Sequence, residues 1–107
     1  MFKAMIMLTR REDLTHAEFV DWWLKEHSPL ASSLPRLRKL AFNVVDPGAE
    51  EAGIDGVSEL WFDSRADFDA AYGTDIGRAT AADSMAHVSG RARLFVTEHE
   101  YAGPGPA

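Results

Sequence analysis

The sequence contains no cysteine among its 107 residues. This absence excludes disulfide bonds, thiolate nucleophiles and metal sites with cysteine ligands. A chain without disulfides is typical of a reducing compartment, and the first residues show no basic leader followed by an apolar stretch. The sequence therefore predicts a cytoplasmic protein.

Long hydrophobic runs and clustered basic residues are also missing. No segment approaches the roughly 20 apolar residues that a membrane-spanning helix needs, so no membrane partner is expected. The formal net charge is -6, with 11 basic against 17 acidic side chains. Nucleic acid is not an expected partner either, because its binding requires a clustered basic face. Both absences favour a small hydrophobic or aromatic ligand.

Motifs for cofactors and metals are equally scarce. The sequence has no G-x-G-x-x-G motif and no Walker loop, so no nucleotide cofactor is predicted. Asp83, His87 and His99 lack the H-x-x-x-H or H-x-H spacing of a metal site, so no metal is predicted. Asp83 and His87 are four residues apart and share a helix face, as an acid–base pair or as an ordinary surface pair. No serine is expected beside them for activation, so a hydrolytic triad is not predicted.

The residues that are present suffice for one folded domain. Hydrophobic residues make up 46% of the chain, enough for a single core. Apolar patterning predicts strands at residues 2–9, 37–45, 57–62 and 91–101, and helices at residues 15–34, 64–73 and 74–88. The predicted domain covers residues 1–102, and the Gly- and Pro-rich residues 103–107 are expected to form a flexible tail.

The first predicted helix carries clear boundary signals. Thr15 and Glu18 match the capping-box pattern at its start. Pro29 removes a hydrogen bond from a helix interior, so a kink or restart is predicted there, with Ser28 as the cap. Pro35 ends the segment.

The predicted order β-α-β-β-α-β is that of the ferredoxin-like fold. In this α+β architecture, helices cover one face of a four-stranded antiparallel sheet. In the last strand, Ala92, Leu94 and Val96 are expected to face the helices, and Arg93 and Phe95 the opposite side. An exposed apolar sheet face marks an interaction site. Homodimerisation through the sheet faces is the predicted way of covering it.

His27 is the sharpest chemical signal in the chain. On a helical wheel it falls near the middle of an apolar arc, whereas Trp22 falls beyond the edge, towards a rim or a partner chain. The arc comprises Phe19, Val20, Trp23, Leu24, Leu30, Ala31 and Leu34. Burial favours the neutral imidazole and the nearby helix end favours the charged form, so a pKa near neutrality, suited to general acid–base work, is expected. A histidine hydrogen-bonded in the core is the alternative.

Other side chains allow two interpretations each. Trp23 and Trp61 suit either a core or a pocket wall. Asn43 suits hydrogen bonding to a ligand or to a neighbouring turn. Tyr72, near the end of a helix, suits a cavity phenol or an ordinary half-buried tyrosine.

Several segments together resemble one protein family. Residues 19–30 (FVDWWLKEHSPL) contain an aromatic residue, a tryptophan, and a histidine followed by a small residue, Pro and Leu. Residues 34–43 (LPRLRKLAFN) and 55–64 (DGVSELWFDS) follow, with Asp83 and Glu98 at acidic positions nearer the chain end. In order and spacing these segments are similar to the EthD family over nearly the whole chain.

The resemblance implies a dimeric α+β barrel, a homodimer with a ligand cavity between each sheet and its helices. It also implies a role for His27, since the related muconolactone-type isomerases and polyketide cyclases use cavity histidines for proton transfer without a cofactor. Two departures concern the specific reaction. Leu40 replaces a tyrosine found in many EthD-like proteins, and Tyr72 lacks the nearby histidine of the related cyclases.

Three functional hypotheses follow. In the first, the protein is a catabolic enzyme without a cofactor, and His27 moves a proton during isomerisation, cyclisation or decarboxylation of an aromatic or lactone-like compound. The residues expected to bind the substrate are Trp23, Phe42, Asn43, Trp61, Tyr72 and Asp83. The second is a non-catalytic ligand-binding or accessory protein of an oxidative, monooxygenase-linked degradation pathway. The third, a haem-binding or monooxygenase-type barrel with His27 as iron ligand, has no other support in the sequence.

Overall fold

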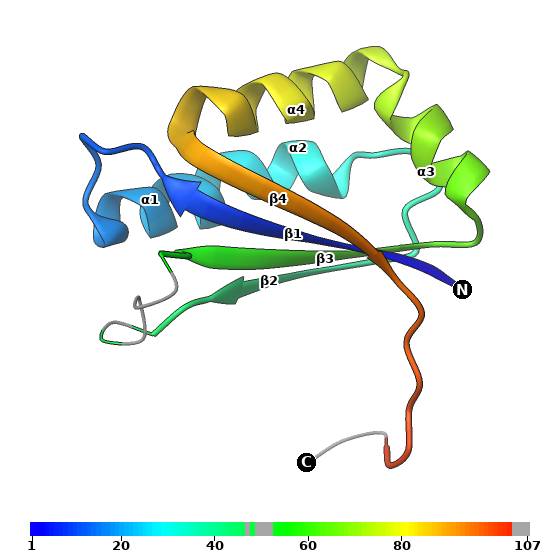
Figure 1. Ribbon diagram of the computed structural model, residues 1–107. Coiled ribbons are helices and arrows are strands. Elements are labelled where there is room, and N and C mark those ends of the chain that lie inside the picture. The colour runs from blue at the N-terminus through cyan, green and yellow to red at the C-terminus, as the bar shows by residue number, and fades with distance from the viewer. Residues whose placement is uncertain (47, 49–52, 104–107) are drawn as a thin grey trace.

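In the computed structural model, which describes residues 1–46, 48 and 53–103, an antiparallel four-stranded sheet carries its helices on one face (Figure 1). The order across the sheet is β2-β3-β1-β4. The strands are β1 (Phe2–Arg10), β2 (Lys39–Val44), β3 (Gly56–Phe62) and β4 (Val88–Val96). The predicted ferredoxin-like α+β fold is confirmed.

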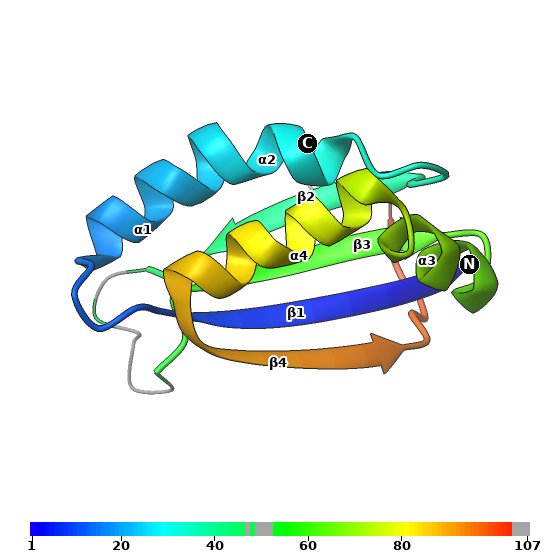
Figure 2. The ribbon, with the colours of Figure 1, turned by 90° about the horizontal axis from the view of Figure 1, so that it is seen from above.

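The helical layer consists of two rows that run side by side above the sheet (Figure 2). The first row is α1 (His16–Trp22), the π-helical turn η1 (Trp23–His27) and α2 (Ser28–Ser32); the second is α3 (Arg65–Tyr72) followed by α4 (Asp75–His87). The predicted capping box is confirmed: the Thr15 hydroxyl accepts from the Glu18 amide, and the Glu18 carboxylate accepts from the Thr15 amide. Within the described residues, no helix is long and apolar enough to cross a membrane.

The core lies between the sheet and the helices. Ala4, Ile6 and Leu8 alternate along β1 and are buried on this face. Each fully buried large side chain stabilises the fold by roughly 1.5–3 kcal/mol. The other large members of this core are Phe19, Trp22, Trp23, Leu34, Leu60, Phe62 and Phe68.

The expected faces of β4 are wrong. Phe95 pairs with Ala4 and therefore points towards the helices, where its ring lies 5.4 Å from that of Phe68. Leu94 pairs with Met5 on the opposite side. Both phases of β4 contain apolar residues, so alternation alone cannot say which phase faces the helices. The strand also ends at Val96 and not at residue 101, because its pairing with β1 ends there.

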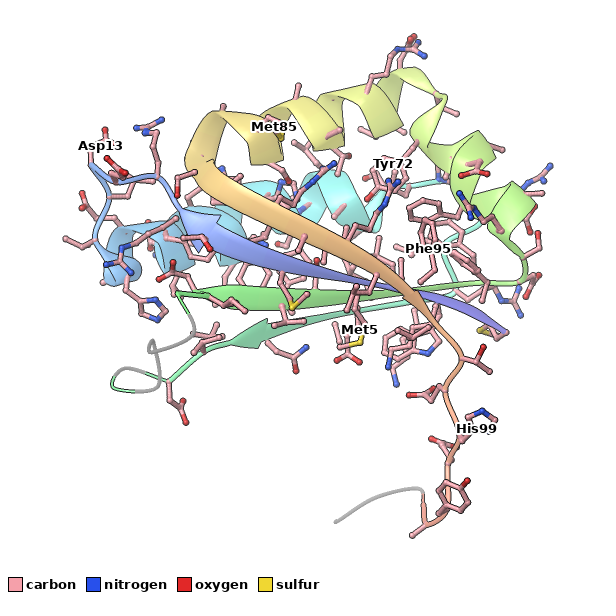
Figure 3. The ribbon with its side chains drawn as sticks, viewed as in Figure 1. Met5, Asp13, Tyr72, Met85, Phe95 and His99 are labelled. Atoms are coloured by element: carbon pink, nitrogen blue, oxygen red, sulfur yellow. The ribbon has the colours of Figure 1, made fainter. Side chains whose placement is uncertain are left out.

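The face of the sheet away from the helices is open in this chain, and it is called the open face below. Figure 3 shows Met5 on this side, below the sheet. Leu94 is 48% exposed. At one end, Lys3 bridges Glu59 (2.6 Å) and Glu98 (3.0 Å). The open face thus combines apolar side chains with a paired ionic cluster.

Past β4, residues 97–103 run away from the sheet on the open-face side, where His99 lies (Figure 3). Of the predicted flexible tail, only Gly103 is described. Residues 104–107 lie outside the described residues, so that prediction stays untested.

Candidate active site around His27

His27 occupies the last position of the π-helical turn η1. The Ser28 amide donates to the Trp23 carbonyl five residues earlier, which widens the helix by one residue. Pro29 lacks an amide hydrogen and crowds the carbonyl four residues before it, which favours such a departure from a regular turn. The helix continues through this turn instead of restarting, and the Ser28 hydroxyl donates to the Leu24 carbonyl instead of acting as a cap.

The wide turn also explains two errors of the helical wheel. Trp23, His27 and Ala31 are four residues apart and all buried, whereas a regular helix turns once in 3.6 residues. The extra residue in η1 keeps Trp23, His27 and Ala31 on the same, buried face of the helix. Trp22, expected at a rim, is only 5% exposed, whereas Leu24, expected inside, is 44% exposed.

Asp83 of α4 holds the imidazole from the other helical row. His27 Nδ1 lies 2.8 Å from Asp83 Oδ2. A carboxylate can only accept, so Nδ1 carries the proton and Nε2 of the neutral ring is an acceptor. Burial lowers the pKa of His27 below its usual 6.5, and the Asp83 carboxylate, which favours the charged ring, offsets only part of this effect. His27 is therefore neutral at pH 7.

Two aromatic groups fix Asp83 in turn. Trp22 Nε1 donates to Asp83 Oδ1 at 3.4 Å, and His87 Nδ1 donates to the Asp83 carbonyl at 2.8 Å. The rings of Trp22 and His87 stack with centroids 4.1 Å apart. The predicted pair Asp83–His87 therefore exists, but its shorter contact runs to the backbone carbonyl, and the carboxylate serves His27.

Ser84 lies on the far side of the imidazole, with Oγ 3.3 Å from His27 Nε2. Ser84 was not among the expected site residues, because no serine was expected beside the acid–base pair. Gly77, Thr80 and Ser84 are the buried residues of α4, three and four positions apart. That helical spacing of small residues was the signal that places Ser84 on the buried face.

A cavity opens in front of His27 Nε2 and Ser84, between the sheet and the two helical rows. It measures about 360 Å³ including its opening, but its enclosed part has room for about one water molecule. Its lining residues are Ile6, Leu8, His27, Ala31, Leu40, Phe42, Ser58, Leu60, Tyr72, Thr80, Ala81, Ser84 and Arg91. Apolar walls with a few polar groups are typical of a small-molecule site.

Phe42 and Trp23 form one end of this site. Phe42 lines the cavity, and its ring stacks on Trp23 with centroids 4.3 Å apart and planes 1° from parallel. Trp23 supports Phe42 from behind and is not itself a lining residue. Gly56 makes room for Trp23, since a methyl group at position 56 would lie 2.5 Å from the indole ring.

Tyr72 and Arg91 form the opposite end. Figure 3 shows Tyr72 between the helices and the sheet. Burial raises the pKa of Tyr72 above 10.0, against the opposing effect of the positive charges on Arg91 and Arg93, so the phenol stays protonated at neutral pH. Arg91 was not among the expected site residues, because the sequence pattern predicted that this phase of β4 faces away from the helices.

Asn43 and Trp61 do not join this site. Both lie on the open face, where Asn43 Nδ2 donates to Glu59 Oε1 at 2.8 Å. Trp61 Nε1 donates to Glu98 Oε1 at 3.2 Å, and its ring lies 4.5 Å from the Lys3 ammonium. The structure thus brings together His27, Phe42 and Tyr72 at the cavity, with Trp23 and Asp83 behind them. No group of three His, Asp or Glu side chains that suits a metal ion occurs in the described part of the chain.

Comparisons with known proteins agree with this architecture. An EthD family protein from Bacillus halodurans superposes with a TM-score of 0.75 at 23% identity, covering 92% of this chain and 100% of that one. A dimeric ferredoxin-like protein of unknown function from Thermobifida fusca gives a TM-score of 0.74 at 18% identity, covering 91% and 90%. A hydroxynitrile lyase from Passiflora edulis gives 0.74 at 15% identity, covering 95% and 96%.

At these levels of sequence identity, structural similarity shows only that the proteins share a fold. No curated protein sequence matches this chain significantly. The EthD domain, however, matches residues 11–90, which include every residue that lines the cavity except Ile6, Leu8 and Arg91. The match covers well over half of the 107 residues. The chain therefore belongs to the EthD family.

Proposed function

We propose that this protein is a cofactor-free enzyme of small-molecule catabolism, in which His27 acts as general acid–base on an aromatic or lactone-like substrate. The hydrogen bond from His27 Nδ1 to Asp83, 2.8 Å long, carries this proposal. It fixes the tautomer that leaves Nε2 as a proton acceptor on the cavity side. The Passiflora hydroxynitrile lyase is an enzyme with a similar fold, which supports a catalytic role.

The proton transfer follows from the geometry. A substrate C–H next to a carbonyl enters in front of Nε2, displacing the Ser84 hydroxyl, and Nε2 takes the proton. The imidazolium that forms is stabilised by the Asp83 carboxylate on its other nitrogen. Returning the proton to a different carbon gives isomerisation, and attack of the carbanion on a second carbonyl carbon, whose oxygen takes the proton, gives cyclisation. In decarboxylation the bond to the carboxylate carbon breaks and releases carbon dioxide, and a protonated His27 gives its Nε2 proton to the carbanion that is left. General acid–base catalysis of this kind contributes about 10²–10⁴-fold to a rate.

Proton exchange tests the proposal without knowledge of the product. A panel of enolisable lactones and aryl ketones is incubated with the protein in D₂O, and loss of the C–H signal is followed by NMR. Wild-type protein is expected to accelerate exchange for at least one compound, and His27→Gln to abolish it. His99→Gln, in the arm beyond β4, is the matched control. Binding of a compound without exchange favours a purely ligand-binding or accessory protein instead.

A second candidate is acyl transfer, favoured by the order Asp83–His27–Ser84 with contacts of 2.8 and 3.3 Å. Here Ser84 Oγ attacks an ester or lactone carbonyl, its proton passes to Nε2, and the imidazolium protonates the departing alkoxide; water then cleaves the acyl-enzyme. Ser84→Ala separates the two candidates. It abolishes ester hydrolysis if Ser84 is the nucleophile, and it preserves C–H exchange if His27 alone moves the proton.

We also propose that a second copy of this chain covers the open face. The supporting observations are the apolar residues Met5, Met7 and Leu94 on that face and the dimeric description of the Thermobifida protein. Large apolar sheet faces are rarely left in water.

A further inference from the structure

We propose that Arg91 and the Tyr72 hydroxyl form an anion-binding subsite at the mouth of the His27 cavity, so that the ligand is a small carboxylate with an apolar body. The inference deepens the proposed function and rests on it for the identity of the reacting site. Both residues line the cavity that His27 lines. Arg91 is the exposed member of that lining and therefore marks the opening.

Arg91 is an unsatisfied cation within the described chain. The other arginines all have a partner, either a carboxylate or an aromatic ring. These are Arg10 with Asp55, Arg11 with Asp13, Arg36 with Asp67, Arg38 with Asp63, Arg65 with Asp69, Arg78 with Asp75, and Arg93 with the rings of Phe68 and Phe95. Arg91 has no ion pair, side-chain hydrogen bond or ring contact among the described residues, so its donors are available to a ligand.

Tyr72 offers a second donor at the same place. Its hydroxyl makes no hydrogen bond within the described part of the chain, while its ring packs 4.9 Å from that of Phe68. Tyr72 and Arg91 both line this cavity, so the phenol and the guanidinium can serve one ligand. A protonated phenol and a guanidinium at one place offer O–H and N–H donors to the same ligand.

The local charge is positive although the whole chain carries -6. Arg65 and Arg93 both lie over the Phe95 ring, at 4.3 and 5.0 Å, beside the strand that carries Arg91. Of these three cations only Arg65 faces a carboxylate, 3.7 Å away on its own helix. Neither Arg65 nor Arg93 lines the cavity, so the positive charge at its mouth is that of Arg91, which attracts an anion there.

A carboxylate fits these donors best among common small anions with an apolar body. Guanidinium groups bind carboxylates through two parallel N–H···O bonds, and a phenol can donate to the same oxygens. With the carboxylate at Arg91, the apolar part points inward, along Ile6, Leu40 and Leu60, towards His27. The enclosed space holds about one water molecule, so entry of a ring requires side chains of the lining to move apart.

Binding of a charged and a neutral probe of equal shape tests the subsite. Benzoate and benzamide are titrated into uniformly ¹⁵N-labelled protein, and dissociation constants come from amide shifts at concentrations up to roughly 10 mM. Wild-type protein is expected to bind benzoate about tenfold more tightly than benzamide, equivalent to about 1.4 kcal/mol. In Arg91→Met, the affinities for benzoate and benzamide are expected to become equal, and the affinity for benzamide is expected to stay at its wild-type value.

Arg93→Met is the matched control, because Arg93 lies on the same face of β4, two residues away, but packs on phenylalanine rings. It is expected to keep the preference for benzoate. Equal affinities in the wild type, no benzoate binding at these concentrations, or equal losses in both variants would overturn the inference. His27→Gln separates it from the proposed function: benzoate preference retained with C–H exchange lost supports both. Exchange that depends on His27 without any benzoate preference refutes the subsite alone.

Discussion

Asp83 and His27, 56 residues apart in the sequence, are joined across the two helical rows by a 2.8 Å hydrogen bond. The carboxylate orients the imidazole and selects its tautomer, while burial keeps the ring neutral. The π-helical turn and Pro29 carry His27 to this position. The pair therefore links a backbone irregularity to the protonation state of the candidate base.

Asp83→Asn is expected to lower the pKa of His27 further. The carboxylate is the group that favours the imidazolium, and its removal leaves the desolvation by burial unopposed. Turnover should fall about 10²–10⁴-fold, with the acid limb of its pH profile moved to lower pH. An NMR titration of the imidazole measures the pKa without a substrate. Asp69→Asn, on the exposed side of α3, is the control; an unchanged His27 pKa in Asp83→Asn would refute the positioning role.

Stability should depend on pH through His27 in a defined direction. The pKa of His27 is lower in the folded chain than its usual 6.5, so between these two values the unfolded chain binds more protons. The free energy of unfolding therefore falls as the pH drops below about 6.5, until the folded pKa is reached.

His27→Gln removes this contribution, so its urea-unfolding free energy should depend less on pH in that window than that of the wild type. His99→Gln should follow the wild type. The unfolding free energies of the wild type and of His27→Gln could instead differ by a constant amount from pH 7.5 downward. That result would show that burial does not shift the pKa of His27.

Gly56→Ala is expected to destabilise the fold by about 1–3 kcal/mol, as overpacking of a core does. The added methyl group would lie 2.5 Å from the Trp23 ring, which is held in place by its stack on Phe42. Gly90→Ala, in β4 of the same sheet, is the matched control, because the nearest atom to its added methyl group would be Thr9 Cβ at 3.6 Å. Thermal unfolding of both variants checks the prediction. Equal losses of stability in the two variants would show that the Trp23 ring can move away from the added methyl group.

Leu94→Asp is expected to convert a dimer into monomers. The substitution places a charge on the open face, at a position that is half exposed in the single chain. Sedimentation velocity should show half the wild-type mass. Met85→Asp, on α4 and 61% exposed, should leave the mass unchanged. A wild-type protein that sediments as a monomer at all concentrations would contradict sheet-to-sheet assembly.

The sequence predicts most of the architecture because its strongest signals are local. Thr15 and Glu18 mark a helix start through contacts three residues apart, and His27 falls on the apolar side of its helix by periodicity alone. The orientation of β4 is different, because Arg93 and Phe95 alternate with Ala92 and Leu94 in two equally plausible phases. Only the pairing with β1 decides between them, and that pairing is a long-range property.

The site residues that were not predicted from the sequence also depend on long-range packing. Ser84 reaches His27 only because the two helical rows lie side by side, and Arg91 reaches the cavity only through the register of β4. In β2 the apolar residues Leu40 and Phe42 alternate with polar or small ones, a pattern that already indicates that Asn43 faces away from the core. In β3 both phases mix apolar and polar residues, so alternation does not place Trp61. The position of both residues on the open face follows from residue parity in β2 and β3 once the sheet is assembled.

The most direct measurement is the ¹H–¹⁵N correlation spectrum of the His27 imidazole, recorded from pH 5 to pH 8 and assigned by comparison with His27→Gln. The account predicts a neutral ring at pH 7 with the proton on Nδ1, a bare Nε2, and a pKa below the usual 6.5. A proton on Nε2 in the neutral ring, or an imidazolium that persists above pH 7, would contradict the assignment of His27 as the base.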